Sequence, residues 1–224
     1  MPIAIEVDHL SKSYSGHRVL TDVSLTVPQG ATIGLVGANG SGKSVLFKAI
    51  CGITKPDSGS VRIDGVRLGE KSDFPPNMGV FINSPGFIGL YSGFRNLKFL
   101  ANIKGMISDQ QIRDSMVKVG LDPDNKTRVD HYSLGMKQKL GLAQAIMEDQ
   151  DILVLDEPFN ALDFHTYNDI KEIIRCLQQE GKTILLTSHH YEDIEQLCES
   201  VYIIDDTRVV PVTQELISRY FGQK

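Results

Sequence analysis

The apolar and polar positions of the 224-residue chain follow two periodicities, which separate predicted strands from predicted helices. Short apolar or alternating runs rich in β-branched residues predict strands at 3–7, 19–27, 31–36, 58–64, 78–82, 151–155, 183–187 and 201–204. Helical apolar spacing predicts helices at 45–51, 94–120, 134–148, 166–180 and 192–199. Strands that alternate with helices favour a mostly parallel sheet with helices on its faces.

The middle of the chain interrupts this alternation. Residues 84–150 carry helical spacing and no further strand pattern. We therefore predict one domain over residues 1–224. Segments 1–83 and 151–224 form its α/β core, and segment 84–150 is an inserted helical subdomain.

A glycine-rich loop follows the predicted strand at 31–36 and precedes the predicted helix at 45–51. It matches the pattern G-x-x-x-x-G-K-[ST] and consists of Gly37, Ala38, Asn39, Gly40, Ser41, Gly42, Lys43 and Ser44. In such a P-loop, backbone N–H groups surround the α- and β-phosphates, the lysine reaches the β- and γ-phosphates, and the final hydroxyl ligates Mg²⁺. The strand–loop–helix context favours a nucleotide site over a glycine-rich turn without a ligand.

Two carboxylates and a histidine follow later apolar strands. Asp156 and Glu157 end the predicted strand at 151–155, and His189 follows the strand at 183–187. We expect Asp156 on the metal side of the phosphates and Glu157 near the γ-phosphate, where it can polarise water as a general base. A solvated acidic turn is the alternative for the pair. His189 lies where open α/β sheets bind ligands, but a structural histidine is also possible, and the adjacent His190 competes for the role.

A second candidate anion site lies at residues 130–140, DHYSLGMKQKL. Ser133 and Gly135 precede a predicted helix, whose first N–H groups have no partners within the helix. The hydroxyl and the glycine could therefore hold an anion, although the stronger phosphate site is elsewhere.

Composition narrows the class of protein. Hydrophobic residues make up 41% of the chain and charged residues 23%, which is ordinary for a globular protein. The net charge of −5 argues against a nucleic-acid partner. The chain has no apolar run of about 20 residues and no signal-peptide pattern, so we expect a cytoplasmic protein. Its three widely spaced cysteines form no metal or disulfide pattern, and we expect mostly buried thiols in a reducing compartment.

The order of these motifs resembles that of ATP-binding-cassette (ABC) ATPases over about residues 3–219. The resemblance implies an α/β fold of the P-loop NTPase, RecA-like type. This fold has a mostly parallel sheet core, an N-terminal antiparallel β portion and an inserted helical subdomain. The implied activity is hydrolysis of ATP with Mg²⁺.

The resemblance also assigns roles to single residues. Tyr14 matches the aromatic residue that stacks on adenine, and Val45 extends the nucleotide contacts of the P-loop. Asp163 belongs to the D-loop, which crosses to a second subunit. Lys43, Glu157 and His189 match catalytic positions, whereas His190 does not.

The stretch Tyr132–Met136 resembles the signature Leu-Ser-Gly-Gly-Gln, although three of its five positions differ. Ser133 and Gly135 are thereby predicted to touch the γ-phosphate held by another subunit, and Leu134 between them is also predicted to belong to the nucleotide-binding stretch. Two cassettes would then close head to tail over two ATP molecules, and a homodimer is permitted. Leu134 replaces a glycine and Met136 a glutamine, but the Ser133 hydroxyl and the Gly135 amide remain.

Asn83 occupies a position where the family normally has a glutamine that reaches Mg²⁺ and the attacking water. Asparagine is one methylene shorter. We expect either metal contact through a water molecule or weaker coupling between the helical subdomain and the nucleotide.

Three further stretches, at residues 82–87, 96–97 and 133–140, are similar to the ATPases of bacitracin and lantibiotic-immunity exporters. The resemblance implies a subunit that powers a transmembrane permease on a separate chain, with export of an antibiotic peptide or other drug-like substrate. The partner would dock around residues 84–96, where Phe87, Ile88, Leu90 and Tyr91 are either contacts or helical core. The alternatives are a soluble ABC ATPase that acts on ribosomes or DNA and an inactive nucleotide-binding regulator.

Overall fold

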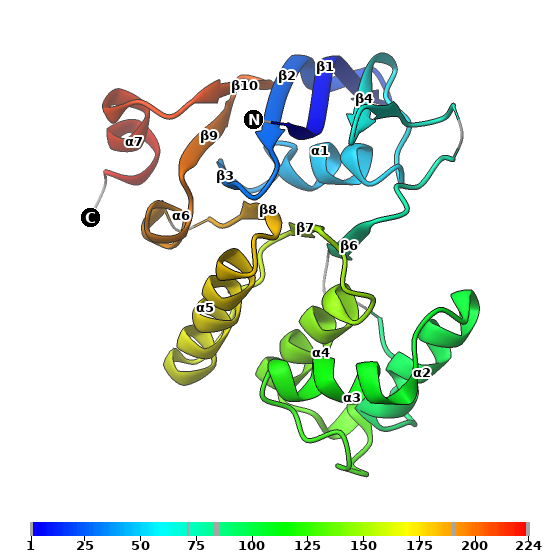
Figure 1. The fold of residues 1–224 in the computed structure, drawn as a ribbon. Coiled ribbons are helices and arrows are strands. Elements are labelled where there is room, and N and C mark those ends of the chain that lie inside the picture. Colours follow the sequence, from blue (N-terminus) through cyan, green and yellow to red (C-terminus); the bar gives the residue numbers. More distant parts are fainter. Residues whose placement is uncertain (1, 71, 83–85, 190, 223–224) are drawn as a thin grey trace.

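Two sheets and a group of helices make up the protein (Figure 1). The structure is a computed structural model that describes the chain except for residues 1, 71, 83–85, 190 and 223–224. The smaller sheet is antiparallel, with the order β2-β1-β4-β5. Its strands are β1 (Ile3–Tyr14), β2 (His17–Pro28), β4 (Ser58–Ile63) and β5 (Val66–Arg67).

The larger sheet has the order β10-β9-β3-β8-β7-β6. Its strands are β3 (Thr32–Val36), β6 (Met78–Phe81), β7 (Ile152–Leu155), β8 (Thr183–Thr187), β9 (Ser200–Asp205) and β10 (Arg208–Pro211). Neighbouring strands are parallel except β9 and β10. Every residue of β3, β7 and β8 is buried, which explains why these strands read as continuous apolar runs rather than alternating ones. The predicted α/β fold with an antiparallel N-terminal portion is confirmed.

The helices fall into two groups in Figure 1. The sheets are accompanied by α1 (Lys43–Ile50), α5 (Phe164–Gln179), α6 (Tyr191–Leu197) and α7 (Gln214–Phe221). The other group, drawn in green below the sheets, contains α2 (Gly93–Lys104), α3 (Asp109–Lys118) and α4 (Leu134–Ile146), with a 3₁₀ turn at Val129–His131. The subdomain boundaries proposed from the sequence, at 83/84 and 150/151, stay a prediction.

Side-chain caps explain where several helices begin. Ser92, Ser108, Ser133 and Asp163 each accept a hydrogen bond from a backbone N–H in the first turn of α2, α3, α4 and α5. The helical region expected at 94–120 consists of two helices, because Gly105 takes a φ of 65° and ends α2. The sequence analysis did not identify β5, β10 or α7.

A close backbone contact joins the green helices to the larger sheet. A Cβ atom built at Gly79, in edge strand β6, would lie 1.9 Å from the Ala145 carbonyl oxygen of α4. Only glycine therefore allows α4 to approach β6 this closely.

The three cysteines differ in accessibility. Cys51 is buried, Cys198 is half-buried, and Cys176 on α5 is exposed, so the expectation of mostly buried thiols is wrong for Cys176. Burial raises the pKa of the Cys51 and Cys198 thiols to about 12.

Candidate functional site

The P-loop connects β3 to α1, as the sequence predicts. Gly42 precedes α1 with a φ of 109°, a conformation that disfavours any residue with a Cβ. A Cβ there would also lie 3.0 Å from Cγ1 of Val19, because β2 packs directly on the loop. Tyr14 ends β1 in the same hairpin, and its ring is half exposed and available for stacking. Its adenine contact stays a prediction.

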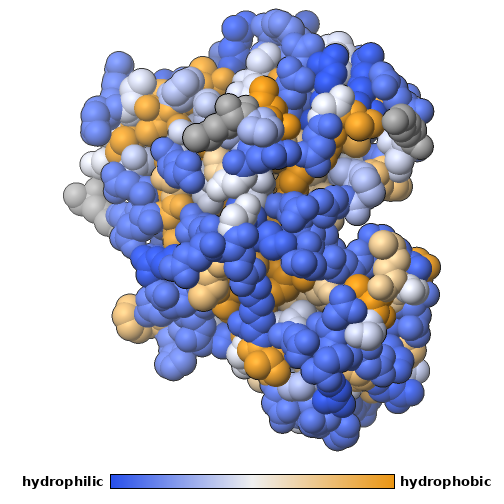
Figure 2. Space-filling model, viewed as in Figure 1, coloured by the Kyte–Doolittle hydropathy of each residue, from blue (hydrophilic) through white to orange (hydrophobic). Residues whose placement is uncertain are grey.

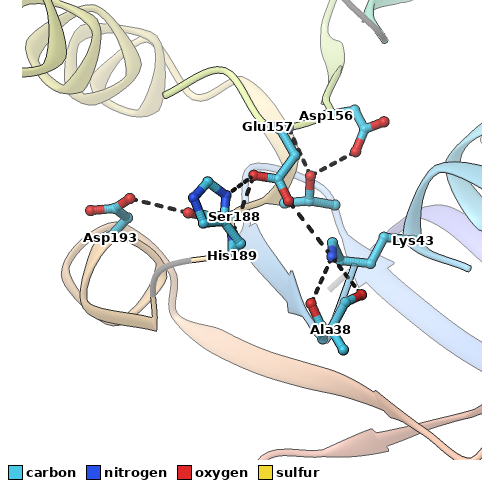
Figure 3. A network of polar contacts seen from close by, with 9 residues as sticks. Ala38, Lys43, Asp156, Glu157, Ser188, His189 and Asp193 are labelled. Atoms are coloured by element: carbon cyan, nitrogen blue, oxygen red, sulfur yellow. Dashed lines mark hydrogen bonds and ion pairs between the residues drawn. The ribbon is translucent and has the colours of Figure 1, made fainter. Parts of the chain in front are cut away.

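Lys43 is the charged centre of this loop. Its side chain is only 6% exposed, and its Nζ donates hydrogen bonds to the carbonyl oxygens of Gly37 at 2.7 Å and Ala38 at 3.2 Å. The third neighbour is the Glu157 carboxylate, whose Oε1 lies 3.6 Å from Nζ (Figure 3). The buried ammonium group is thus held in place at the start of α1.

Glu157 joins Lys43 to His189. The Oε2 atom of Glu157 lies 2.7 Å from His189 Nδ1 and accepts a hydrogen bond from the His189 backbone N–H at 3.2 Å (Figure 3). Three residues that are far apart in the sequence are thereby brought together. His190 lies outside the described residues, so the structure does not compare the two histidines.

Asp156 is 4% exposed and follows β7 directly. Its backbone N–H donates to the Phe81 carbonyl oxygen at 2.7 Å, which continues the pairing of β7 with β6. Its carboxylate accepts a hydrogen bond from Thr187 Oγ1 at 2.8 Å. The same hydroxyl accepts the Glu157 backbone N–H at 2.8 Å. Thr187 was not singled out from the sequence, although a polar residue ending an otherwise apolar strand is a signal that could have identified it.

His189 is preceded by Ser188, which belongs to a second polar group. Ser188 Oγ donates to the buried Asp193 carboxylate at 3.1 Å, and Tyr167 on α5 donates to the same carboxylate. Burial and the hydrogen bond to Asp193 raise the pKa of Tyr167. Ser188, in the segment directly after β8, is therefore linked through Asp193 to α5.

Asp163 and Ser133 both cap helices. Asp163 accepts hydrogen bonds from the backbone N–H groups of His165 and Thr166, both at 3.0 Å, and from the Thr166 hydroxyl. The bonds from Thr166 and His165 lower the pKa of Asp163.

Ser133 accepts a hydrogen bond from the Met136 N–H at 3.2 Å, and Leu134 is exposed. Gly135 is buried against Thr166, whose Cγ2 would lie 2.6 Å from an added Cβ. The structure does not bring this stretch to the P-loop of the same chain by any hydrogen bond among the described residues.

The residues present fit a magnesium–nucleotide complex. In the described part of the chain, no three His, Cys, Asp or Glu side chains cluster as metal ligands. The buried Asp156 carboxylate would bind a cation together with the phosphate oxygens of a nucleotide. Mg²⁺ commonly binds in that way, with one or two carboxylates plus substrate phosphates. Among the described residues, the buried Ser41 hydroxyl of the P-loop has no hydrogen-bond partner. Asn83 lies outside the described residues.

Comparison with known proteins decides the family. A family model described as "ABC transporter" matches residues 20–160, which include the P-loop, the signature stretch and Glu157. The chain belongs to the ABC transporter family. It is an ABC ATPase, which hydrolyses ATP to ADP and phosphate.

Individual relatives agree with this assignment. The ABC ATPase is 43% identical over 195 residues to an uncharacterized ABC transporter ATP-binding protein, YybJ, of Bacillus subtilis (strain 168), covering 87% of this chain and 89% of that protein. It is 34% identical to the bacitracin transport ATP-binding protein BcrA of Enterococcus faecalis, covering 94% of this chain and 69% of BcrA. The expected likeness to bacitracin-type ATPases is confirmed.

The fold also agrees with a solved structure. The structure of an ATP-binding subunit of an ABC transporter superposes with a TM-score of 0.83 and 28% identity, covering 98% of this chain and 93% of that one. Subunits of this kind generally dimerise and pair with a transmembrane partner. None of the helices formed by the described residues is long and apolar enough to span a bilayer.

Proposed function

We propose that this ABC ATPase powers the export of a peptide antibiotic or similar drug-like compound through a transmembrane permease on a separate chain. The similarity to a bacitracin transport protein supports the substrate class. An apolar surface beside a cleft in the helical part of the molecule supports the docking of a partner, and it is the observation that carries the proposal.

The cleft has a volume of about 260 Å³ and lies between β6, α2 and α4. Ile103 at its edge is 80% exposed, and Met106 is 76% exposed. Ile88 and Leu90, in the predicted docking segment, are also exposed, whereas Phe87 packs against the core. A notch between the upper and lower parts of the molecule and apolar side chains at the right edge are visible in Figure 2. Exposed apolar surface of this kind favours a protein partner over bulk solvent.

The proposed chemistry uses the arrangement around Lys43. The P-loop N–H groups and Lys43 bind the phosphates, and His189 holds the γ-phosphate and the attacking water. Glu157 accepts a proton from this water while the oxygen of the water bonds to the γ-phosphorus. The bond between the γ-phosphorus and the bridging oxygen breaks, and that oxygen leaves with ADP. Its carboxylate supports that role because it already lies between Lys43 and His189. Ser44 and Asp156 would hold Mg²⁺, which neutralises phosphate charge when bound.

A second copy would supply the remaining contacts. Ser133 and Gly135 lie at the beginning of α4, where backbone N–H groups and the helix dipole favour an anion. The outward position of Leu134 supports contact with another subunit. We therefore propose a head-to-tail homodimer with two ATP molecules in its interface, bound to the cytoplasmic side of the membrane through the permease. Nucleic acid is not a proposed partner.

The test is to express a tagged Glu157→Gln variant in the native host, trap it with ATP and Mg²⁺, and identify the proteins that purify with it from solubilised membranes. The amide should retain ATP and the closed pair, because only the group that activates water is lost. A co-purifying polytopic membrane protein would support the proposal.

Two control variants make this experiment specific. Lys43→Ala should lose the ATP-dependent pair. Ile103→Glu should lose the membrane protein but keep ATP binding, because Ile103 is an exposed residue of α2 that lines the cleft and is not part of the P-loop. Recovery of ribosomal or DNA-bound material without a membrane protein would overturn the proposal in favour of a non-transport ABC ATPase.

A further inference from the structure

We infer that Thr187 is a positioning residue for ATP hydrolysis, because its single hydroxyl holds the Asp156 side chain and the Glu157 backbone together. The inference rests on the proposed roles of these two carboxylates. Thr187 itself would touch neither nucleotide nor water.

The sheet register explains why Thr187 is in this place. In the parallel pair of β7 and β8, Leu155 is opposite Leu186, so the next residues, Asp156 and Thr187, are also neighbours. Thr187 is 0% exposed. Its Oγ1 atom lies 2.8 Å from Asp156 Oδ1 and 2.8 Å from the Glu157 backbone nitrogen.

The direction of both hydrogen bonds follows from the groups involved. The Glu157 N–H can only donate, so the hydroxyl oxygen of Thr187 accepts it. An ionised carboxylate can only accept, so the one hydroxyl proton points to Asp156. The single proton of the Thr187 hydroxyl is thus committed to Asp156, and one of its two lone pairs accepts the Glu157 N–H. Neither partner can turn without breaking one of these two bonds.

Both bonds fix geometry that the reaction needs. Glu157 has a φ of 53°, in the left-handed region that residues with a Cβ rarely adopt, and the Thr187 bond holds its N–H in that conformation. Its side chain consequently lies between Lys43 and His189 (Figure 3). Asp156 meanwhile accepts the Thr187 hydroxyl at Oδ1, and we assign its Oδ2 to the metal side.

If Thr187 only stabilised the fold, its loss would affect ATP hydrolysis no more than the loss of another buried hydroxyl. The same strand contains a residue for this control. Thr183, at the opposite end of β8, is 3% exposed, and its Oγ1 accepts the Gly30 backbone N–H at 2.9 Å. Thr183→Val and Thr187→Val both remove a buried hydroxyl that accepts a backbone N–H. Only the second change affects the proposed catalytic carboxylates.

The experiment compares steady-state ATP hydrolysis by the wild type, Thr187→Val, Thr187→Ser and Thr183→Val, with Glu157→Gln as the inactive reference. We expect kcat of Thr187→Val to fall about 10- to 100-fold, because small displacements of catalytic groups have effects of this size. The KM for ATP should stay within about threefold, since the P-loop contacts are intact. Thr187→Ser, which keeps the hydroxyl, should recover kcat to within about threefold of the wild type.

A second measurement uses the protein without nucleotide or metal. Amide hydrogen exchange at Glu157, followed by NMR, should be at least about tenfold faster in Thr187→Val than in the wild type or Thr187→Ser, because the N–H loses its acceptor. Exchange at Val154, within the β7 ladder, should not change between these proteins. If Thr187→Val is not folded, Thr187→Ala provides the same comparison with Thr187→Ser.

The inference is wrong if Thr187→Val and Thr187→Ser have the same kcat, or if Thr183→Val loses as much activity as Thr187→Val. Glu157→Gln separates this failure from a failure of the proposed function. If Glu157→Gln retains wild-type kcat, the role of Glu157 is wrong; if it is inactive while Thr187→Val is fully active, only the role of Thr187 is wrong.

Discussion

Two regions contain the predicted ATP contacts: the P-loop edge of the large sheet and the N-terminal end of α4, which carries the signature stretch. They differ in how their residues are arranged. At the P-loop edge, Glu157 contacts both Lys43 and His189, and Lys43 is almost completely buried. At the signature end, the side chain of Ser133 bonds to its own helix, and Leu134 faces outward. The first region is assembled within one chain. The second presents a helix end that a facing subunit can use.

This difference follows from the elements that carry the residues. Strand order and register determine which residues meet at the edge of a parallel sheet, so the chain alone can bring distant motifs together. A helix N-terminus needs only its cap and leaves its remaining N–H groups directed outward. Four changes test the contrast, from the largest expected effect to the smallest.

The largest effect should come from Glu157→Gln. We expect ATP turnover to fall about a thousandfold, as is typical for loss of a general base, while ATP affinity stays within a few fold. Phosphate release and equilibrium binding of a fluorescent ATP analogue measure the two quantities. Wild-type turnover in this variant would contradict the proposal that the P-loop edge, through Glu157, supplies the general base.

Gly135→Ala should show which region binds the nucleotide of its own chain and which contacts that of a partner. An added Cβ would lie 2.6 Å from Thr166 Cγ2 and 2.7 Å from its Oγ1, so the beginning of α4 must shift. We expect ATP binding by the monomer to be unchanged and turnover to fall about 10- to 100-fold, because the proposed contact across the dimer is displaced.

The double variant Gly135→Ala/Thr166→Ala is the control, since it removes both close atoms. Turnover of the double variant should exceed that of Gly135→Ala. Weakened ATP binding by the Gly135→Ala monomer would mean that the signature end serves the nucleotide of its own chain.

Gly79→Ala should lower stability rather than chemistry. Its Cβ would meet the Ala145 carbonyl oxygen at 1.9 Å, and a backbone atom cannot turn away as a side chain can. We expect the free energy of unfolding to fall by about 1–3 kcal/mol, as for other overpacked positions. Urea unfolding measures this loss. Gly65→Ala is a comparison without a close neighbour, although its φ of 77° adds strain of its own.

Lys139→Met should have the smallest effect. Lys139 on α4 donates to Asp169 on α5 at 2.7 Å, and this bond lowers the pKa of Asp169 below its ordinary value of 3.8. The stabilisation is therefore present at neutral pH and is lost as the pH falls through the lowered pKa. We expect about 0.2–1 kcal/mol at pH 7 and a smaller difference from the wild type near pH 3.

Lys98→Met provides the comparison for this pair. Lys98 binds Asp109 at 2.8 Å, but both side chains are more exposed than those of Lys139 and Asp169, and both belong to the α2–α3 region. Urea unfolding should detect little change in this variant. An equal loss of unfolding free energy in both variants would mean that the ion pair between α4 and α5 stabilises the protein no more than an exposed pair between α2 and α3.

The sequence predicted most of the larger sheet because its buried strands are apolar along their whole length. It also assigned Lys43, Glu157 and His189, which follow three strands of that sheet, to the same γ-phosphate, and that assignment stays a prediction. It did not predict α7 or β10, which contain no fully buried residue. The helical spacing of Leu216, Ile217, Tyr220 and Phe221 was a signal that could have identified α7. The pairing of Thr187 with Asp156 depends on strand register, which a single sequence does not specify.

The accessible thiol of Cys176 makes this comparison measurable without altering the chain. Because the pKa values of Cys51 and Cys198 are raised to about 12, a maleimide dye at neutral pH should attach selectively to α5. In a head-to-tail dimer, the two dyes would mark corresponding points on the two copies. Energy transfer between them would then follow each cycle of closing and opening in real time, in the native sequence.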